Sequence, residues 1–72
     1  MKVNKSQAVM LILFTLLNRK SLTKEEIKEI IDIADISFKR YMQEIRAFLA
    51  NFDIGLEVIY NRKEAKYYIK NI

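Results

Sequence analysis

Residues 22–45 read LTKEEIKEIIDIADISFKRYMQEI and contain the features that decide the fold. Thr23 can cap a helix, and Glu26 follows three residues later, which is the spacing of a capping box. Acidic side chains near this start suit the positive end of a helix dipole. The pattern predicts a helix over about residues 24–33. Its expected core stripe has helical spacing and consists of Ile27, Ile30 and Ile31.

A second helix is predicted directly after the first one. Residues 34–36 form the short connection, and Ser37 is the expected N-cap of a helix over about residues 38–50. Phe38 and Met42 lie beside its core stripe and are expected to complete the core. That core stripe is expected to consist of Tyr41, Ile45, Phe48, Leu49 and Phe52.

The segment before residue 22 predicts one more helix, over about residues 5–19. Asn4 can cap its start, and Arg19 and Lys20 suit its negative end. Its apolar residues form more than one stripe, although a small domain can rarely bury a helix on all sides. One face carries Val9, Ile12, Leu13 and Leu16, and another carries Met10, Phe14 and Leu17.

The segment after residue 50 predicts a hairpin over about residues 56–70. Residues 56–60 and 66–70 are rich in β-branched and aromatic side chains, which is typical of strands. Residues 61–65 join them, and Gly55, the only glycine, lies where the chain must change direction. We therefore expect an α+β fold, mainly α, with a single domain over residues 1–72.

Composition excludes several classes of function. The chain has 72 residues with no Cys and no His, which excludes a disulfide frame, a thiolate metal site and a Ser-His-Asp triad within it. One Gly and no Pro leave no Gly-rich phosphate loop. Glu25, Glu26 and Glu29 cluster at a helix start without a second acid across a cleft. We expect no enzyme activity, no cofactor and no metal.

An apolar run over residues 8–17 follows Lys2 and Lys5 and has the appearance of a signal peptide. No small-residue cleavage site follows it, and a bilayer span needs about 20 residues. We expect a buried helix here, a cytoplasmic protein and no membrane partner.

Two helices joined by a short turn, the second with a basic polar face, are typical of a helix-turn-helix. A following hairpin with a basic tip would be a wing, so the order predicts a winged helix-turn-helix: three helices followed by a two-stranded β-hairpin. The recognition helix, residues 38–50, would enter the major groove of double-stranded DNA. The net charge of +4 is consistent with this partner, although acidic groups concentrate in residues 21–36.

The candidate DNA contacts follow from this placement. Base edges are expected to meet Lys39, Arg40 and Gln43, because Lys and Arg can bind guanine and Gln can bind adenine. Ser37 and Arg46 are expected to meet phosphates. The wing would use Arg62, Lys63 and Lys66 on phosphates or in the minor groove.

Each contact has a structural alternative. Ser37 can act as a helix cap alone, and the polar face of the recognition helix can be merely solvated. The wing charges can protect an edge strand from aggregation. Phe38 and Met42 can instead contact a thymine methyl group or a partner. The hairpin tyrosines are expected to pack on the recognition helix, with base stacking as the alternative; they are Tyr60, Tyr67 and Tyr68.

Residues Leu22-Thr23-Lys24-Glu25-Glu26-Ile27 and Ile36-Ser37-Phe38-Lys39-Arg40-Tyr41-Met42-Gln43-Glu44-Ile45 resemble the N-terminal domain of bacterial regulators of the DeoR and WYL-domain type. The recognition helix of that group reads Ser-x-Arg-Thr-Ile-x-Arg-Asp-Ile. The resemblance covers nearly the whole chain and implies a winged helix that binds DNA in a transcriptional regulator. Such regulators are usually longer, so the chain would be either an N-terminal domain or a small stand-alone protein.

Residues 37–45 match the pattern of that group at some positions and depart from it at others. Ser37 and Ile45 match directly, and Lys39 stands for the first Arg, Tyr41 for Ile and Glu44 for Asp. The departures are Arg40 in place of Thr, Gln43 in place of the second Arg, and a charged wing turn over residues 61–66 in place of a Gly-rich one.

An alternative function is a winged-helix module that binds protein. The second apolar stripe of the first helix would then form a partner surface or a homodimer interface. That stripe consists of Met10, Phe14 and Leu17.

Overall fold

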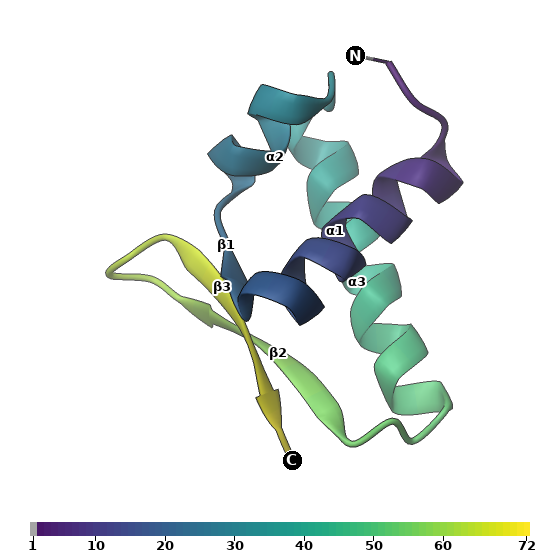
Figure 1. Cartoon of the computed structure of the whole chain (residues 1–72), viewed down its shortest axis with the longest axis vertical. Helices are drawn as coiled ribbons and strands as arrows, with labels where there is room; N and C mark the ends of the chain where they lie inside the picture. The colour runs from purple at the N-terminus through teal and green to yellow at the C-terminus, as the bar shows by residue number, and fades with distance from the viewer. Residues whose placement is uncertain (1) are drawn as a thin grey trace.

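Helices and strands follow one another in the order α1, β1, α2, α3, β2, β3 in the computed structural model, which describes residues 2–72 (Figure 1). Within these residues the strands form one antiparallel sheet in the order β1-β3-β2. The expected winged helix-turn-helix fold is confirmed, with a third strand added to the predicted hairpin. The elements are α1 (Lys5–Arg19), β1 (Ser21–Leu22), α2 (Lys24–Ile30), α3 (Asp35–Asn51), β2 (Leu56–Asn61) and β3 (Lys66–Asn71).

Local chemistry sets both ends of α1. The Asn4 Oδ1 atom accepts a hydrogen bond from the Gln7 backbone N–H at 2.8 Å, so the predicted cap is confirmed. At the other end Lys20 adopts a left-handed conformation with φ of 69°, and its N–H donates to the Leu16 carbonyl at 2.9 Å. This turn leads directly into β1. No helix within residues 2–72 is both long and apolar enough to cross a bilayer.

The start of α2 is the predicted capping box, with both of its hydrogen bonds. The Thr23 N–H donates to Glu26 Oε1 at 2.7 Å, and the Glu26 N–H donates to Thr23 Oγ1 at 3.1 Å. The predicted end at residue 33 is wrong, because the helix stops at Ile30. Ile31 adopts an extended conformation that buries its side chain, whereas Ile30 is 49% exposed and does not belong to the core.

The predicted start of α3 is also wrong. The helix begins at Asp35, and its N-cap is Ala34, which makes no side-chain capping bond. The Phe38 N–H donates to the Ala34 carbonyl at 2.9 Å, and Asp35 places a negative charge at the positive end of the helix. Ser37 therefore lies in the first turn and is not the cap. The helix ends at Asn51, one residue later than expected.

The core face of α3 differs from the predicted one by a rotation about the helix axis. Phe48 and Phe52 are 42% and 71% exposed, and Tyr41 is half-buried. Both stripes have helical spacing, so the sequence pattern alone does not choose between them. Contact with the hairpin favours the stripe that contains Phe38, because the rings of Phe38 and Tyr67 lie 5.6 Å apart. The buried side chains of α3 are Phe38, Met42, Ile45 and Leu49.

The sheet attaches the hairpin to the helices. β1 pairs with β3 through Ser21 and Leu22, opposite Tyr68 and Tyr67. The hairpin loop after β2 extends away from the helices (Figure 1). Every element meets in one core, whose largest fully buried side chains are Phe38, Ile12, Leu16, Leu22, Ile27 and Ile45. α3 and the hairpin thus pack against the same core.

Candidate nucleic-acid interface

A groove of about 590 Å³ separates α3 from the hairpin, and we call it the wing groove. α3 contributes the flank of side chains next to its core stripe, and the N-terminal turn of α2 closes one end. The polar residues that line it are Lys24, Asp35, Lys39, Gln43, Arg46 and Arg62.

Aromatic rings form the apolar wall of the wing groove. The Tyr60 and Tyr67 rings lie 4.6 Å apart with a tilt of 48°, and Tyr67 also contacts Phe38. Burial raises the pKa of the Tyr67 hydroxyl, and Tyr60 adds to the rise. Packing of the hairpin tyrosines on α3 is confirmed for Tyr67. Tyr60 is 42% exposed and its ring contacts that of Tyr67, while the Tyr68 hydroxyl donates a hydrogen bond to Glu64.

A second hollow of about 490 Å³ lies on the other side of α3, and we call it the outer groove. Lys5 of α1 borders it, and the Lys5 Nζ atom lies 3.0 Å from Glu44 Oε2 of α3. Gln43 lines both grooves, so α3 forms a ridge between two depressions. From α3 the outer groove receives Ser37, Arg40, Tyr41, Gln43, Glu44 and Ala47.

The structure therefore divides the predicted contact residues into three groups. Lys39, Gln43, Arg46 and Arg62 meet in the wing groove. Ser37 and Arg40 line the outer groove, because successive residues of a helix point about 100° apart. Two wing residues line neither groove; they are Lys63 in the hairpin turn and Lys66 at the start of β3.

Nearby positive charges influence Glu26 of the capping box. The pKa of the Glu26 carboxyl is lowered mainly by the hydrogen bond from the Thr23 N–H. Arg19, at 3.0 Å from Glu26 Oε2, and Lys66 lower it further.

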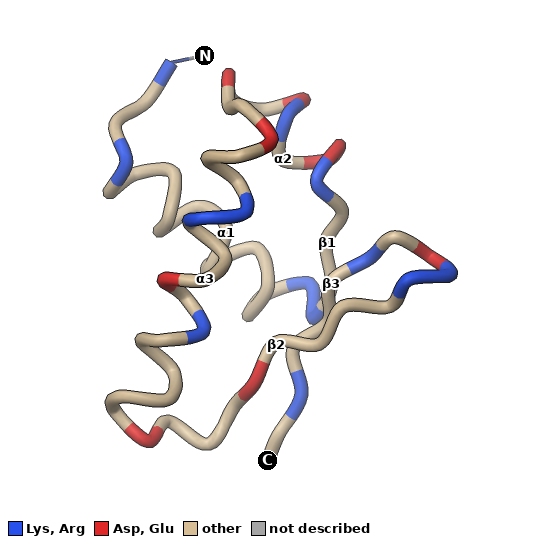
Figure 2. Tube along the Cα trace, turned by 180° about the vertical axis from the view of Figure 1, so that it is seen from behind, with Lys and Arg blue, Asp and Glu red and all other residues tan. Residues whose placement is uncertain are grey.

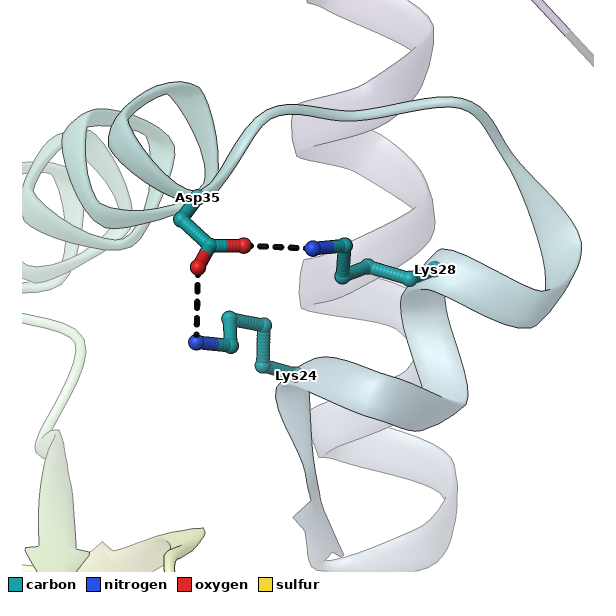
Figure 3. A network of polar contacts seen from close by, with 3 residues as sticks. All are labelled: Lys24, Lys28 and Asp35. Carbon is teal, nitrogen blue, oxygen red and sulfur yellow. Dashed lines mark hydrogen bonds and ion pairs between the residues drawn. The ribbon is translucent and has the colours of Figure 1, made fainter.

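Two groove residues were missed by sequence reasoning, Lys24 and Asp35. The Asp35 carboxylate lies between two lysines of α2, with Lys24 Nζ at 3.2 Å and Lys28 Nζ at 2.5 Å (Figure 3). The hydrogen bonds from Lys28 and then Lys24 lower the Asp35 pKa, and Asp35 raises the Lys24 pKa. An acidic residue directly after Ala34 was the available signal for an earlier helix start.

Basic residues lie on α1, on α2, on α3 and at the hairpin tip, with acidic residues between them along the chain (Figure 2). Many of these charges are paired, as at Lys5, Lys24 and Lys28. In the described part of the chain, the cations of α3 and the arginine of the wing form no ion pair. These unpaired groups are Lys39, Arg40, Arg46 and Arg62.

Between residues 2 and 72 no three His, Cys, Asp or Glu side chains gather where they could hold a metal ion. The resemblance of residues 22–45 to DeoR-type and WYL-domain regulators stays a prediction that rests on the residues themselves. No protein-family model, no curated protein and no solved structure matches this chain.

Proposed function

We propose that this chain is the DNA-binding domain of a cytoplasmic bacterial transcriptional regulator, with α3 in the major groove and the hairpin on the flanking backbone. One observation carries the proposal. In the wing groove, unpaired cations from two separate elements, Lys39 and Arg46 of α3 and Arg62 of the hairpin, border a common space. A helix face that is only solvated does not require cations of a neighbouring hairpin to border the same space.

The shape of this surface supports the same function. A major groove about 12 Å wide admits one helix, and a sugar-phosphate strand borders it on each side. α3 is a ridge with a depression on each side, so it can enter the groove while the two strands settle into the two depressions. Gln43, which lines both depressions, then faces the base edges, with Lys39 on one flank and Arg40 on the other.

Charge in the wing groove gives an expected salt dependence. If Lys39, Arg46 and Arg62 each neutralise one phosphate, the logarithm of affinity falls with the logarithm of salt at a slope of about −2.7. A rise from about 50 to about 200 mM salt then weakens binding roughly 40-fold. Binding that relied on hydrogen bonds alone would lack this dependence.

Fluorescence anisotropy with a labelled random duplex across a salt series tests the proposal directly. We expect the steep slope above, and Lys39→Ala, Arg40→Ala and Gln43→Ala should each weaken binding. A flat slope with micromolar or weaker binding would count against DNA binding. Unchanged binding in all three variants would remove α3 from the interface.

The outer face of α1 favours a second candidate function, a homodimer or protein-interaction surface. Met10, Phe14 and Leu17 are 60%, 65% and 41% exposed, and they lie opposite the buried Ile12 and Leu16. Sedimentation velocity measures this function: a dimer that Phe14→Gln converts to a monomer supports it, and a monomer at all concentrations argues against it. Both functions can coexist, because helix-turn-helix dimers bind paired half-sites.

A further inference from the structure

The junction of α2 and α3 holds an anion between two ammonium groups. Each Asp35 carboxylate oxygen faces one lysine, Oδ2 toward Lys24 and Oδ1 toward Lys28 (Figure 3). A DNA phosphate also presents two non-bridging oxygens that accept hydrogen bonds from lysine. Lys24 and Asp35 line the wing groove, so this cluster is continuous with the surface proposed to bind DNA.

The cluster of Lys24, Lys28 and Asp35 is open to solvent, so its ion pairs can exchange partners easily. The side chains of Lys24, Lys28 and Asp35 are 36%, 41% and 62% exposed. Ion pairs at such exposure contribute little to stability, because water and salt screen them. An incoming phosphate can therefore replace the carboxylate without disturbing the fold. The Arg19–Glu26 pair differs, because Glu26 is also fixed by the capping box.

We propose that Asp35 occupies the place of a DNA phosphate in the free protein and competes with DNA for Lys24 and Lys28. The inference rests on the proposed function, and it adds these two lysines of α2 to the interface. The first helix of a helix-turn-helix crosses the DNA backbone, which brings a phosphate to α2. Once that phosphate binds, the displaced Asp35 carboxylate lies beside a like charge. Asp35 thus weakens DNA binding.

Neutralising Asp35 should strengthen binding by a measurable amount. A single additional phosphate contact steepens the salt slope by about 0.9 and tightens binding roughly 8-fold near 0.1 M salt. If Lys24 and Lys28 each gain a contact, the slope steepens by about 1.8. Asp35→Asn should therefore bind duplex DNA about 8-fold tighter than the wild type, or more.

Asp53→Asn is the matched control, since it makes the same chemical change at the other end of α3. The helix has 17 residues, so the two sites are about 25 Å apart. Asp53 has φ of 52°, a conformation that Asn tolerates well. Its effect should stay within about twofold, because 0.1 M salt screens charges over about 10 Å. Asp35→Ser serves as a second neutral variant should Asp35→Asn fail to fold.

A Lys24→Gln, Lys28→Gln double variant tests the competition itself. In the wild-type background it should weaken binding less than in the Asp35→Asn background, because Asp35 competes with DNA for both lysines. Combined with Asp35→Asn, it should remove the entire gain. Equal losses in both backgrounds would overturn the inference.

The same titrations separate the two levels of proposal. If the wild type binds with a steep salt slope but Asp35→Asn and Asp35→Ser bind no tighter than Asp53→Asn, the inference fails and the proposed function stands. If the wild type and every variant show flat, weak binding, both fail.

Discussion

Replacing Arg46 and Arg62 with Gln removes two positive charges from the wing groove. Arg46 comes from α3 and Arg62 follows β2 across the groove, and both side chains are exposed. Gln is a good helix former, and surface substitutions usually change stability by no more than about 0.5 kcal/mol. The double variant should therefore fold normally and report on binding alone.

The expected loss follows from the number of phosphates released. One phosphate contact contributes about 0.9 to the salt slope, which amounts to roughly 8-fold in affinity at 0.1 M salt relative to 1 M. Losing two contacts should weaken binding about 60-fold at 0.1 M salt and make the slope shallower by about 1.8. The double variant thus loses two of the three phosphate contacts expected in the wing groove.

Anisotropy titrations of a labelled duplex at several salt concentrations measure both quantities. The matched control is Lys2→Gln with Lys70→Gln, which removes the same charge from residues that line neither groove. Screening over about 10 Å should keep its loss below about threefold. If the two double variants lose affinity equally, net charge rather than the wing groove governs binding, and the reasoning is refuted.

Three further predictions concern the frame that positions this groove. Thr23→Ala breaks the capping box and should cost about 1 kcal/mol of unfolding free energy, measured by thermal denaturation, with an unchanged midpoint as the contrary result. The lowered Glu26 pKa adds stability above the ordinary value of 4.5, and this contribution should disappear as pH falls through the lowered folded-state pKa. Acid titrations of stability should therefore be flatter in Glu26→Gln. Phe38→Ala should cost about 3–5 kcal/mol of a total of roughly 4–11 kcal/mol, visible in urea unfolding.

Helix starts could be predicted where a side chain makes the cap. Asn4 and Thr23 bond to backbone groups three residues away, so the signal is local and complete in the sequence. α3 lacks such a signal, because its N-cap residue Ala34 makes no side-chain hydrogen bond. Ser37 is a good capping residue, and its use as the expected N-cap placed the predicted start three residues too late.

The core face of α3 and strand β1 depend on partners distant in sequence. Phe38 and Phe48 both belong to stripes of helical spacing, and contact with Tyr67 of β3 decides which stripe is buried. β1 has two residues, too few for any alternating pattern, and exists as a strand because β3 pairs with it. No local property of either segment contains this information.

The candidate site was predictable to the extent that it lies on one helix. Lys39, Gln43 and Arg46 share a flank of α3 by helical spacing, and the separation of Arg40 from Lys39 follows from the same geometry. The approach of Arg62 and Lys24 to that flank comes from packing of the hairpin and α2 against α3. Such contacts are set by the folded core and not by neighbours in sequence.

Pairing of charges, more than their total, decides what this surface can bind. Glu44 offsets Lys5 beside the outer groove, and Asp35 offsets lysines of α2 beside the wing groove. The cations left unpaired on α3 and at the start of the hairpin loop are those that border the two depressions. Asp35→Asn and Asp53→Asn raise the net charge from +4 by the same amount. If they nevertheless differ in DNA affinity, the difference must come from the position of the carboxylate, because the total charge is identical.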